Sequence, residues 1–156
     1  MNILIVDGNE KDASDQYTKL GMDTQYQVYT KILKKLFKNK CKILTIHPTL
    51  NDNFIPNGIN LDDFEGIAWT GSVLNIYDTK PSINRQIELA KILINKKNYI
   101  FGSCWGLQVL VTAAGGEIHK NPNGLEAVIA KNICLNEEGI NHPMYYNKNQ
   151  TFDSFC

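Results

Sequence analysis

The chain has 156 residues, a length that suits one domain with a buried core. Its 16 basic residues balance its 16 acidic ones, which argues against a surface for nucleic acid or an anionic membrane. No apolar stretch approaches transmembrane length, and residues 1–7 lack the charged start of a signal peptide. We therefore expect a cytoplasmic protein without nucleic-acid or membrane partners.

The first half of the chain alternates between expected strands and helices. Residues 2–6 are predicted to form the usual first strand of a parallel α/β sheet, because all of them but Asn2 are apolar. The polar residues 11–23 are interpreted as an irregular loop. Residues 26–40 are predicted to form a helix that has a Lys-rich solvent face, because apolar residues recur at helical spacing. These apolar residues are Val28, Ile32, Leu33, Leu36 and Phe37.

The middle of the chain continues this alternation. A second strand is expected at 42–47, followed by a loop rich in Asn and Pro at 48–60. A third strand is expected at 66–69, and residues 70–72 turn away from its end. Residues 81–95 are predicted to be a helix. Its inward residues are expected to be Ile87, Leu89, Ala90 and Leu93.

A fourth, buried strand is expected at 99–101, with a helix at 107–114 that Gly115 and Gly116 end. Residues 126–135 are predicted as one further strand, and 141–156 as loop. The alternation through residue 114 predicts an α/β fold with a doubly wound, mostly parallel sheet and helices on both faces. In such sheets, sites collect at the carboxyl ends of strands.

Cys104 is the most informative residue of the chain. It follows the expected fourth strand and precedes a helix, with Gly102 and Gly106 on either side. This is the pattern of a nucleophile elbow, a turn so sharp that small residues must flank the nucleophile. The elbow directs the backbone N–H of Trp105 and the helix N-terminus toward whatever the sulfur attacks, which favours a thiolate and stabilises an oxyanion.

The remaining cysteines carry no comparable pattern. Cys41, Cys134 and Cys156 are scattered, without a C-x-x-C pair or zinc-like histidine spacing. They are interpreted as small apolar or surface residues. We therefore expect neither a disulfide framework nor a metal site.

Several segments together resemble the class I glutamine amidotransferases, with the stand-alone, GMP synthase-like members most similar. Residues 102–108, Gly-Ser-Cys-Trp-Gly-Leu-Gln, resemble the G-x-C-x-G-x-Q elbow of that family. Residues 69–72 with 76–78 resemble its glycine-bearing oxyanion loop and downstream Tyr-Asp, and 113–116 its A-x-G-G segment. Residues 142–145 and 152–153 resemble the approach to its catalytic histidine. The resemblance implies a flavodoxin-like fold over 1–156, a partial domain incomplete at its C-terminus.

The resemblance also implies a chemistry. Cys104 would attack the side-chain amide of glutamine to give a γ-glutamyl thioester and ammonia. The N–H groups of Gly71 and Trp105 would hold the oxyanion, and Gln108, one helical turn after Cys104, would help Gly71 to bind substrate. The glutaminase half would need no cofactor. ATP would be needed only by a synthetase partner that receives the ammonia.

The general base is the missing part of this constellation. The family's H-x-E pair would lie just downstream of the segment matched by residues 152–156, so the triad His and Glu are not present in this chain. We expect a truncated domain of uncertain activity. His47 is interpreted as a strand-end residue, His119 as solvated and His142 as non-catalytic. Trp69 and Tyr77 are interpreted as core aromatics and Asp78 as structural.

Two other functions stay open at this point. One is a Cys-dependent hydrolase of γ-glutamyl or peptide bonds with the same fold. The other is a degenerate, non-catalytic domain that binds a partner or substrate without turnover.

Overall fold

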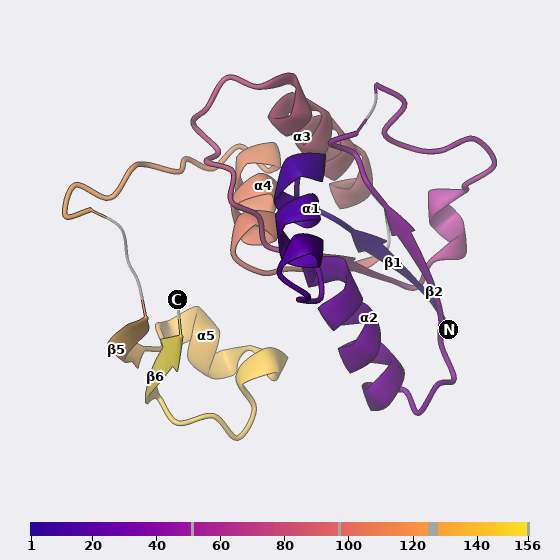
Figure 1. The fold of residues 1–156 in the computed structure, drawn as a ribbon. Helices are drawn as coiled ribbons and strands as arrows, with labels where there is room; N and C mark the ends of the chain where they lie inside the picture. Colours follow the sequence, from indigo (N-terminus) through magenta and orange to yellow (C-terminus); the bar gives the residue numbers. More distant parts are fainter. Residues whose placement is uncertain (51, 97, 125–127, 156) are drawn as a thin grey trace. The chain divides into compact units, whose positions relative to one another are not determined.

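The computed structural model describes residues 1–50, 52–96, 98–124 and 128–155 (Figure 1). These form two compact units, Met1–His119 and Lys120–Cys156, which are considered separately below. The interpretation of residues 1–156 as one domain remains a prediction.

The first unit is built on a four-stranded parallel sheet. Its strands lie in the order β2 (Lys42–Ile46), β1 (Asn2–Val6), β3 (Gly66–Trp69) and β4 (Tyr99–Gly102). The last residues of all four strands lie in register across the sheet. The segments that follow these strands therefore meet at one edge, as expected for a parallel sheet.

Helices lie on both faces of this sheet. The connections β1–β2 and β3–β4 run in opposite directions from the centre of the sheet, and right-handed crossovers then place their helices on opposite faces. Helices α1 (Lys11–Lys19) and α2 (Gln25–Leu36) belong to the first connection. Helix α3 (Pro81–Ile94) belongs to the second and packs against α4 (Trp105–Ala113), beside it in Figure 1. The predicted doubly wound α/β architecture is confirmed.

The main core lies between the sheet and the α3–α4 pair. Alternate residues of each strand point into it, because successive side chains of a strand face opposite sides. Burying one such aliphatic or aromatic side chain stabilises the fold by about 1.5–3 kcal/mol. The fully buried members include Leu4, Val6, Ile46, Trp69, Leu89, Leu93, Trp105 and Val109.

The segment 11–23 differs from the expected irregular loop, because residues 11–19 form α1. This helix buries none of its own side chains, so the sequence has no apolar stripe from which the helix could be predicted. It carries one local ion pair, in which Lys11 Nζ lies 2.5 Å from Asp15 Oδ2. Such i,i+4 pairs each add only a few tenths of a kcal/mol.

Helix α2 forms in the expected segment 26–40 but ends at Leu36, and the prediction of its buried face was wrong. Val28, Ile32 and Leu36 are 39%, 50% and 69% exposed. The partly buried positions follow a neighbouring stripe that includes Tyr26 and Leu33. Since α2 rests mainly on β1, only the residues that face this strand leave the solvent.

Strand β4 is less buried than its apolar sequence predicts. Tyr99 is 86% exposed and Phe101 46%, whereas Ile100 packs against the core. In the described residues β4 is one of the two edge strands of the sheet, and α4 covers the face to which Ile100 points. Its alternate side chains therefore remain in solvent.

The second unit contains an antiparallel pair, β5 (Ile129–Cys134) and β6 (Thr151–Phe155). The expected strand at 126–135 thus forms in part, and its first two residues lie outside the described residues. The loop expected at 141–156 was wrong for β6 and for the short helix η2 (Pro143–Tyr145). Helix α5 (Glu137–Asn141), capped by the Asn136 side chain, precedes them. Strand β6 is too polar to be recognised without its partner.

Candidate active site

Cys104 occupies the sharp turn between β4 and α4. Its backbone has φ 53° and ψ −108°, and the residue stands at the N-cap position of α4. A non-glycine residue in such a conformation carries about 1–3 kcal/mol of strain, which persists only where the surroundings enforce it. The side chain is a free, exposed thiol. This is the geometry predicted for a nucleophile elbow.

The flanking glycines have a steric reason to be small. A Cβ at Gly102 would lie 2.6 Å from the carbonyl carbon of Gly106. A Cβ at Gly106 would lie 2.7 Å from both the Cβ and the carbonyl oxygen of Trp69. The first turn of α4 therefore packs directly on the ends of β3 and β4. Any side chain at either glycine would force these elements apart.

The elbow is hydrogen-bonded to the loop that follows β3. Ser103 N donates to the Trp69 carbonyl over 3.3 Å, and Gly106 N donates to the Thr70 carbonyl over 3.2 Å. These bonds place Gly71, the next residue, beside the elbow at the same sheet edge. The Trp105 N–H belongs to the first turn of α4, where N–H groups have no acceptor within the helix.

Two further predicted positions fit this arrangement. Gln108 N donates to the Cys104 carbonyl over 3.2 Å, so Gln108 lies one helical turn along, and its side chain is partly exposed. Gly71 is buried, and a Cβ there would meet only the end of the Gln25 side chain, at 2.9 Å. The structure thus brings together the four residues proposed from sequence, namely Gly71, Cys104, Trp105 and Gln108.

Asp7, at the end of β1, orders the neighbouring loops. The Thr70 hydroxyl accepts from Gly8 N over 2.9 Å and lies 3.4 Å from the Asp7 carboxylate. His47 Nδ1 lies 3.1 Å from the second carboxylate oxygen of Asp7, and Tyr26 packs edge-on against the His47 ring. His47 follows β2, three strand spacings from β4, which is about 14 Å at ~4.8 Å per strand. It is too far from the thiol to act as its base.

The other two histidines occupy structural or solvent positions. His119 is exposed and pairs with Glu117 over 3.2 Å. His142 Nδ1 accepts from Met144 N over 3.2 Å and so caps η2 in the second unit. Both observations agree with the non-catalytic interpretations from sequence.

Of the two aromatics interpreted as core residues, one is buried. Trp69 is inaccessible to solvent, whereas Tyr77 is 50% exposed and its hydroxyl donates to Asn75. The Asp78 carboxylate accepts from the Asn75 amide over 3.4 Å, in agreement with a structural role in this loop. The prediction for Tyr77 was wrong because this residue lies in the loop between β3 and α3, most of whose residues are exposed or partly exposed.

The sequence interpretation missed two hydrogen-bonded polar residues, Gln86 and Glu10. Gln86 is fully buried on α3, on the same stripe as Ile83, Ala90 and Leu93. Its three- and four-residue spacing from these neighbours was the available signal. Glu10 accepts from the Ser82 hydroxyl over 2.7 Å and pairs with Lys80 over 3.1 Å. The Ser82 hydrogen bond is the largest of the effects that lower the pKa of Glu10.

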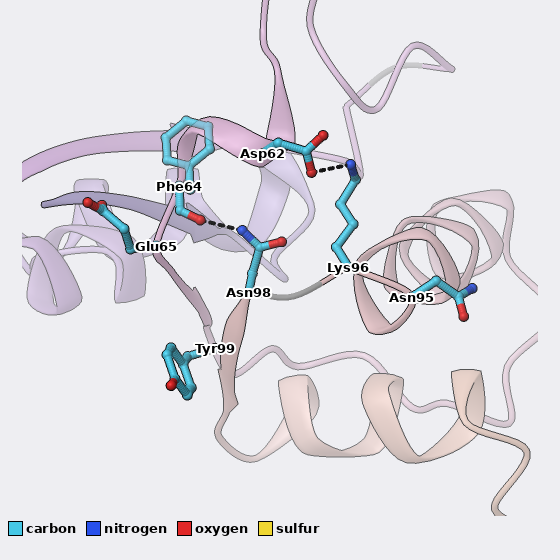
Figure 2. A pocket seen from close by; sticks show the side chains of 7 residues that line it. All are labelled: Asp62, Phe64, Glu65, Asn95, Lys96, Asn98 and Tyr99. Atoms are coloured by element: carbon cyan, nitrogen blue, oxygen red, sulfur yellow. Dashed lines mark hydrogen bonds and ion pairs between the residues drawn. The ribbon is translucent and has the colours of Figure 1, made fainter.

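A hollow of about 550 Å³ lies at the opposite edge of the sheet (Figure 2). Its wall includes the Asp62–Lys96 ion pair, 2.5 Å long, and Asn98, whose amide donates to the Phe64 carbonyl. These residues flank the amino ends of β3 and β4, so this hollow is remote from Cys104. A smaller hollow of about 320 Å³ lies between α1 and Val73, which closely follows Gly71.

Within the described residues, His, Cys, Asp and Glu side chains form no cluster of three or more suited to a metal ion. In the same part of the chain, every helix is too short or too polar to cross a membrane. Cys41, Cys104 and Cys134 are all free thiols. Cys156 lies outside the described residues.

The geometry and the comparison with known families agree. Residues 20–155 match the model of the glutamine amidotransferase class-I family. The chain therefore belongs to that family, as the resemblance of its elbow and oxyanion loop predicted.

Individual relatives refine this placement. Over 99% of its length the chain is 29% identical to a gamma-glutamyl-L-1-hydroxyisopropylamide hydrolase of a Pseudomonas species, of which it covers 52%. Its fold resembles a glutamine amidotransferase of Thermotoga maritima, with a TM-score of 0.63, 12% identity and coverage of 99% and 59% of the two chains. It also resembles SMU.1228c, with a TM-score of 0.64, 16% identity and coverage of 99% and 60%. The chain thus spans little more than half the length of these relatives.

Proposed function

We propose that Cys104 is the nucleophile of an amidotransferase that hydrolyses the side-chain amide of glutamine. The sulfur forms a bond to the amide carbon, the C–N bond breaks, and the nitrogen leaves as ammonia after it takes up a proton. Water then cleaves the γ-glutamyl thioester to give glutamate and the free thiol. The general base is expected from the family's histidine and glutamate, downstream of the segment at 152–153.

The strained elbow is the observation that carries this proposal. A positive φ at Cys104 is sterically costly, yet two close-packed glycines and the hydrogen bonds to Trp69 and Thr70 enforce it. This arrangement holds an exposed thiol at a helix N-terminus, where the helix dipole favours a thiolate and a developing oxyanion. The N–H groups of Gly71 and Trp105 are the proposed oxyanion donors.

Gln108 is proposed to contact the glutamyl part of the substrate. Its partly exposed side chain lies one turn after Cys104 on α4. The ammonia would pass to an acceptor, in a GMP synthase-like reaction if the protein works with an ATP-dependent synthetase. The glutaminase half itself would need no cofactor.

A second candidate function is the hydrolysis of N-substituted γ-glutamyl amides. The relative from Pseudomonas, which aligns with nearly the whole chain, is named for such a substrate. The acyl half of the reaction and the roles of Cys104, Gly71 and Trp105 would be the same. Only the leaving group would differ, an alkylamine in place of ammonia.

Release of glutamate by the full-length protein tests both candidates. Free glutamine and an N-alkyl γ-glutamyl amide are offered separately, and the substrate with the higher kcat/KM identifies the reaction. Cys104→Ala is expected to abolish release from either substrate. The matched control is Cys134→Ala, which removes another exposed free thiol and leaves activity unchanged.

Retention of activity in Cys104→Ala would contradict the proposed nucleophile. Failure of the wild type to consume either substrate, or to react at Cys104 with a glutamine-analogue electrophile, would support the non-catalytic alternative.

A further inference from the structure

Gln86 connects the two halves of the candidate oxyanion site through a single buried amide. Its Oε1 accepts from Trp105 Nε1 over 2.8 Å and from Trp69 Nε1 over 3.2 Å. Its Nε2 donates to the Gly8 carbonyl over 3.3 Å. All three side chains, Gln86, Trp69 and Trp105, are fully buried.

The chemistry of the partners fixes the orientation of this amide. An indole N–H can only donate, so both tryptophans require the oxygen of Gln86, and the amino group must face the Gly8 carbonyl. An amide oxygen has two lone pairs and accepts both bonds. The chain has two tryptophans, and the indole N–H groups of both donate to Gln86 Oε1.

Each partner of Gln86 adjoins a proposed functional group. Trp69 ends β3 and leads through Thr70 to Gly71, whereas Trp105 supplies the other proposed oxyanion N–H and follows Cys104. Gly8 lies against Trp105 and against Gly71. A Cβ at Gly8 would be 2.5 Å from Trp105 Cδ1 and 3.1 Å from the Gly71 carbonyl oxygen.

We propose that Gln86 is the positioning residue of the oxyanion hole, because its amide sets the Gly71 loop and the Trp105 turn in place relative to Cys104. This inference rests on the function proposed above. Gln86 itself does not touch the substrate. It acts by holding two N–H donors at the spacing that a carbonyl oxygen requires.

The alternatives at this position explain why an amide is needed. An aliphatic side chain would leave two buried indole N–H groups without an acceptor, and buried polar groups lacking a partner are costly. A carboxylate would place a charge in the core, facing the Gly8 carbonyl oxygen. Either change would allow the two tryptophans, and the loops attached to them, to shift.

Two reagents applied to Cys104 separate positioning from thiol reactivity. A diazoketone analogue of glutamine presents a carbonyl to the oxyanion donors, whereas iodoacetamide needs only the thiolate. Labelling rates at the Cys104 peptide are measured by mass spectrometry for the full-length wild type and Gln86→Met. The ratio of diazoketone to iodoacetamide rates is expected to fall about 10- to 100-fold in Gln86→Met, since small displacements of donors have effects of this size.

Asn84→Met is the matched control, because it places the same side chain at an exposed site of α3. Its labelling ratio is expected to equal that of the wild type. Tryptophan emission provides an independent readout, since Gln86→Met removes the acceptor of both indoles and is expected to shift the emission to shorter wavelength. If Gln86→Met does not fold, Trp105→Phe keeps an aromatic side chain, though a smaller one, removes the indole N–H that Gln86 accepts and is expected to lower the ratio in the same way.

The outcomes distinguish this inference from the proposed function. A wild-type ratio in folded Gln86→Met, or in Trp105→Phe if that variant decides the test, would overturn the positioning role alone. A wild type with no preference for the glutamine analogue would overturn the proposed function, and the positioning role with it.

Discussion

Replacing Gly102 by alanine adds one methyl group at the end of β4, where the elbow packs most closely. The new Cβ would lie 2.6 Å from the carbonyl carbon of Gly106, 2.7 Å from its oxygen and 2.7 Å from Leu110 Cδ1. Ordinary contact begins at 3.4 Å, so the first turn of α4 must move about 0.8 Å from the strand. Two of these three contacts are with backbone, which no rotamer change relieves.

This displacement has a cost in stability and a cost in reactivity. Overpacking by a methylene-sized group typically destabilises by about 1–3 kcal/mol. A shift near 1 Å at a catalytic group reduces rates by about 100-fold. We therefore expect Gly102→Ala to lower the free energy of unfolding by about 1–3 kcal/mol and to slow labelling of Cys104 by the glutamine analogue by a factor approaching 100.

Urea unfolding followed by circular dichroism measures the first effect, with the m-value compared to confirm a change in stability. Gly66→Ala is the matched control, because Gly66 also lies in a strand but has open space around its Cβ position. That variant is expected to be neutral or stabilised by up to about 1 kcal/mol. Equal midpoints for the wild type and Gly102→Ala, or equal losses in the two variants, would refute the steric argument.

Two further predictions concern the surroundings of the site. Glu10→Gln is expected to destabilise the protein at neutral pH, because the bond from Ser82 stabilises the carboxylate and lowers its pKa below 4.5. Since that stabilisation is lost as pH falls through the folded-state pKa, the difference in urea midpoint between wild type and variant should shrink below pH 4.5, and a constant difference would contradict it. Arg85→Lys keeps the charge but loses the fork that donates to the carbonyls of Pro48, at 2.9 Å, and Thr49, at 2.7 Å. Its free energy of unfolding should fall by about 1–3 kcal/mol, and an unchanged urea midpoint would show that the planar guanidinium is not needed.

The sheet and the elbow were predictable because both depend on short-range sequence features. Residues 3–6 and 66–69 are continuous apolar runs, and the bounds predicted for the two strands agree with the structure. Around Cys104, glycines at fixed offsets allow the close packing of helix on strand that the sharp turn requires. The expected positions of Gly71, Trp105 and Gln108 followed from the family resemblance and from helical spacing.

Burial on α2 and β4 was not predictable in the same way. The stripe of Val28, Ile32 and Leu36 and the side chains of Tyr99 and Phe101 are apolar, yet they remain exposed in the described residues. Hydrophobic periodicity indicates which face of a helix or strand is suited to burial. Whether that face is buried depends on whether another element of the fold packs against it. The prediction for residues 11–19 was wrong in the opposite direction. Helix α1 forms there although it buries no apolar stripe that periodicity could detect.

The sequence by itself therefore determined the α/β class, the family and the position of the strained cysteine, since each can be recognised from short segments taken in order along the chain. Only the tertiary structure identified Gln86 as the buried link between Trp69 and Trp105. Those three residues are separated by 17 and 19 positions, and a shared hydrogen-bond acceptor exists only once α3 has packed on the sheet. The strand order, in turn, placed His47 after β2 and Cys104 after β4, three strands apart, a separation that no sequence spacing reveals.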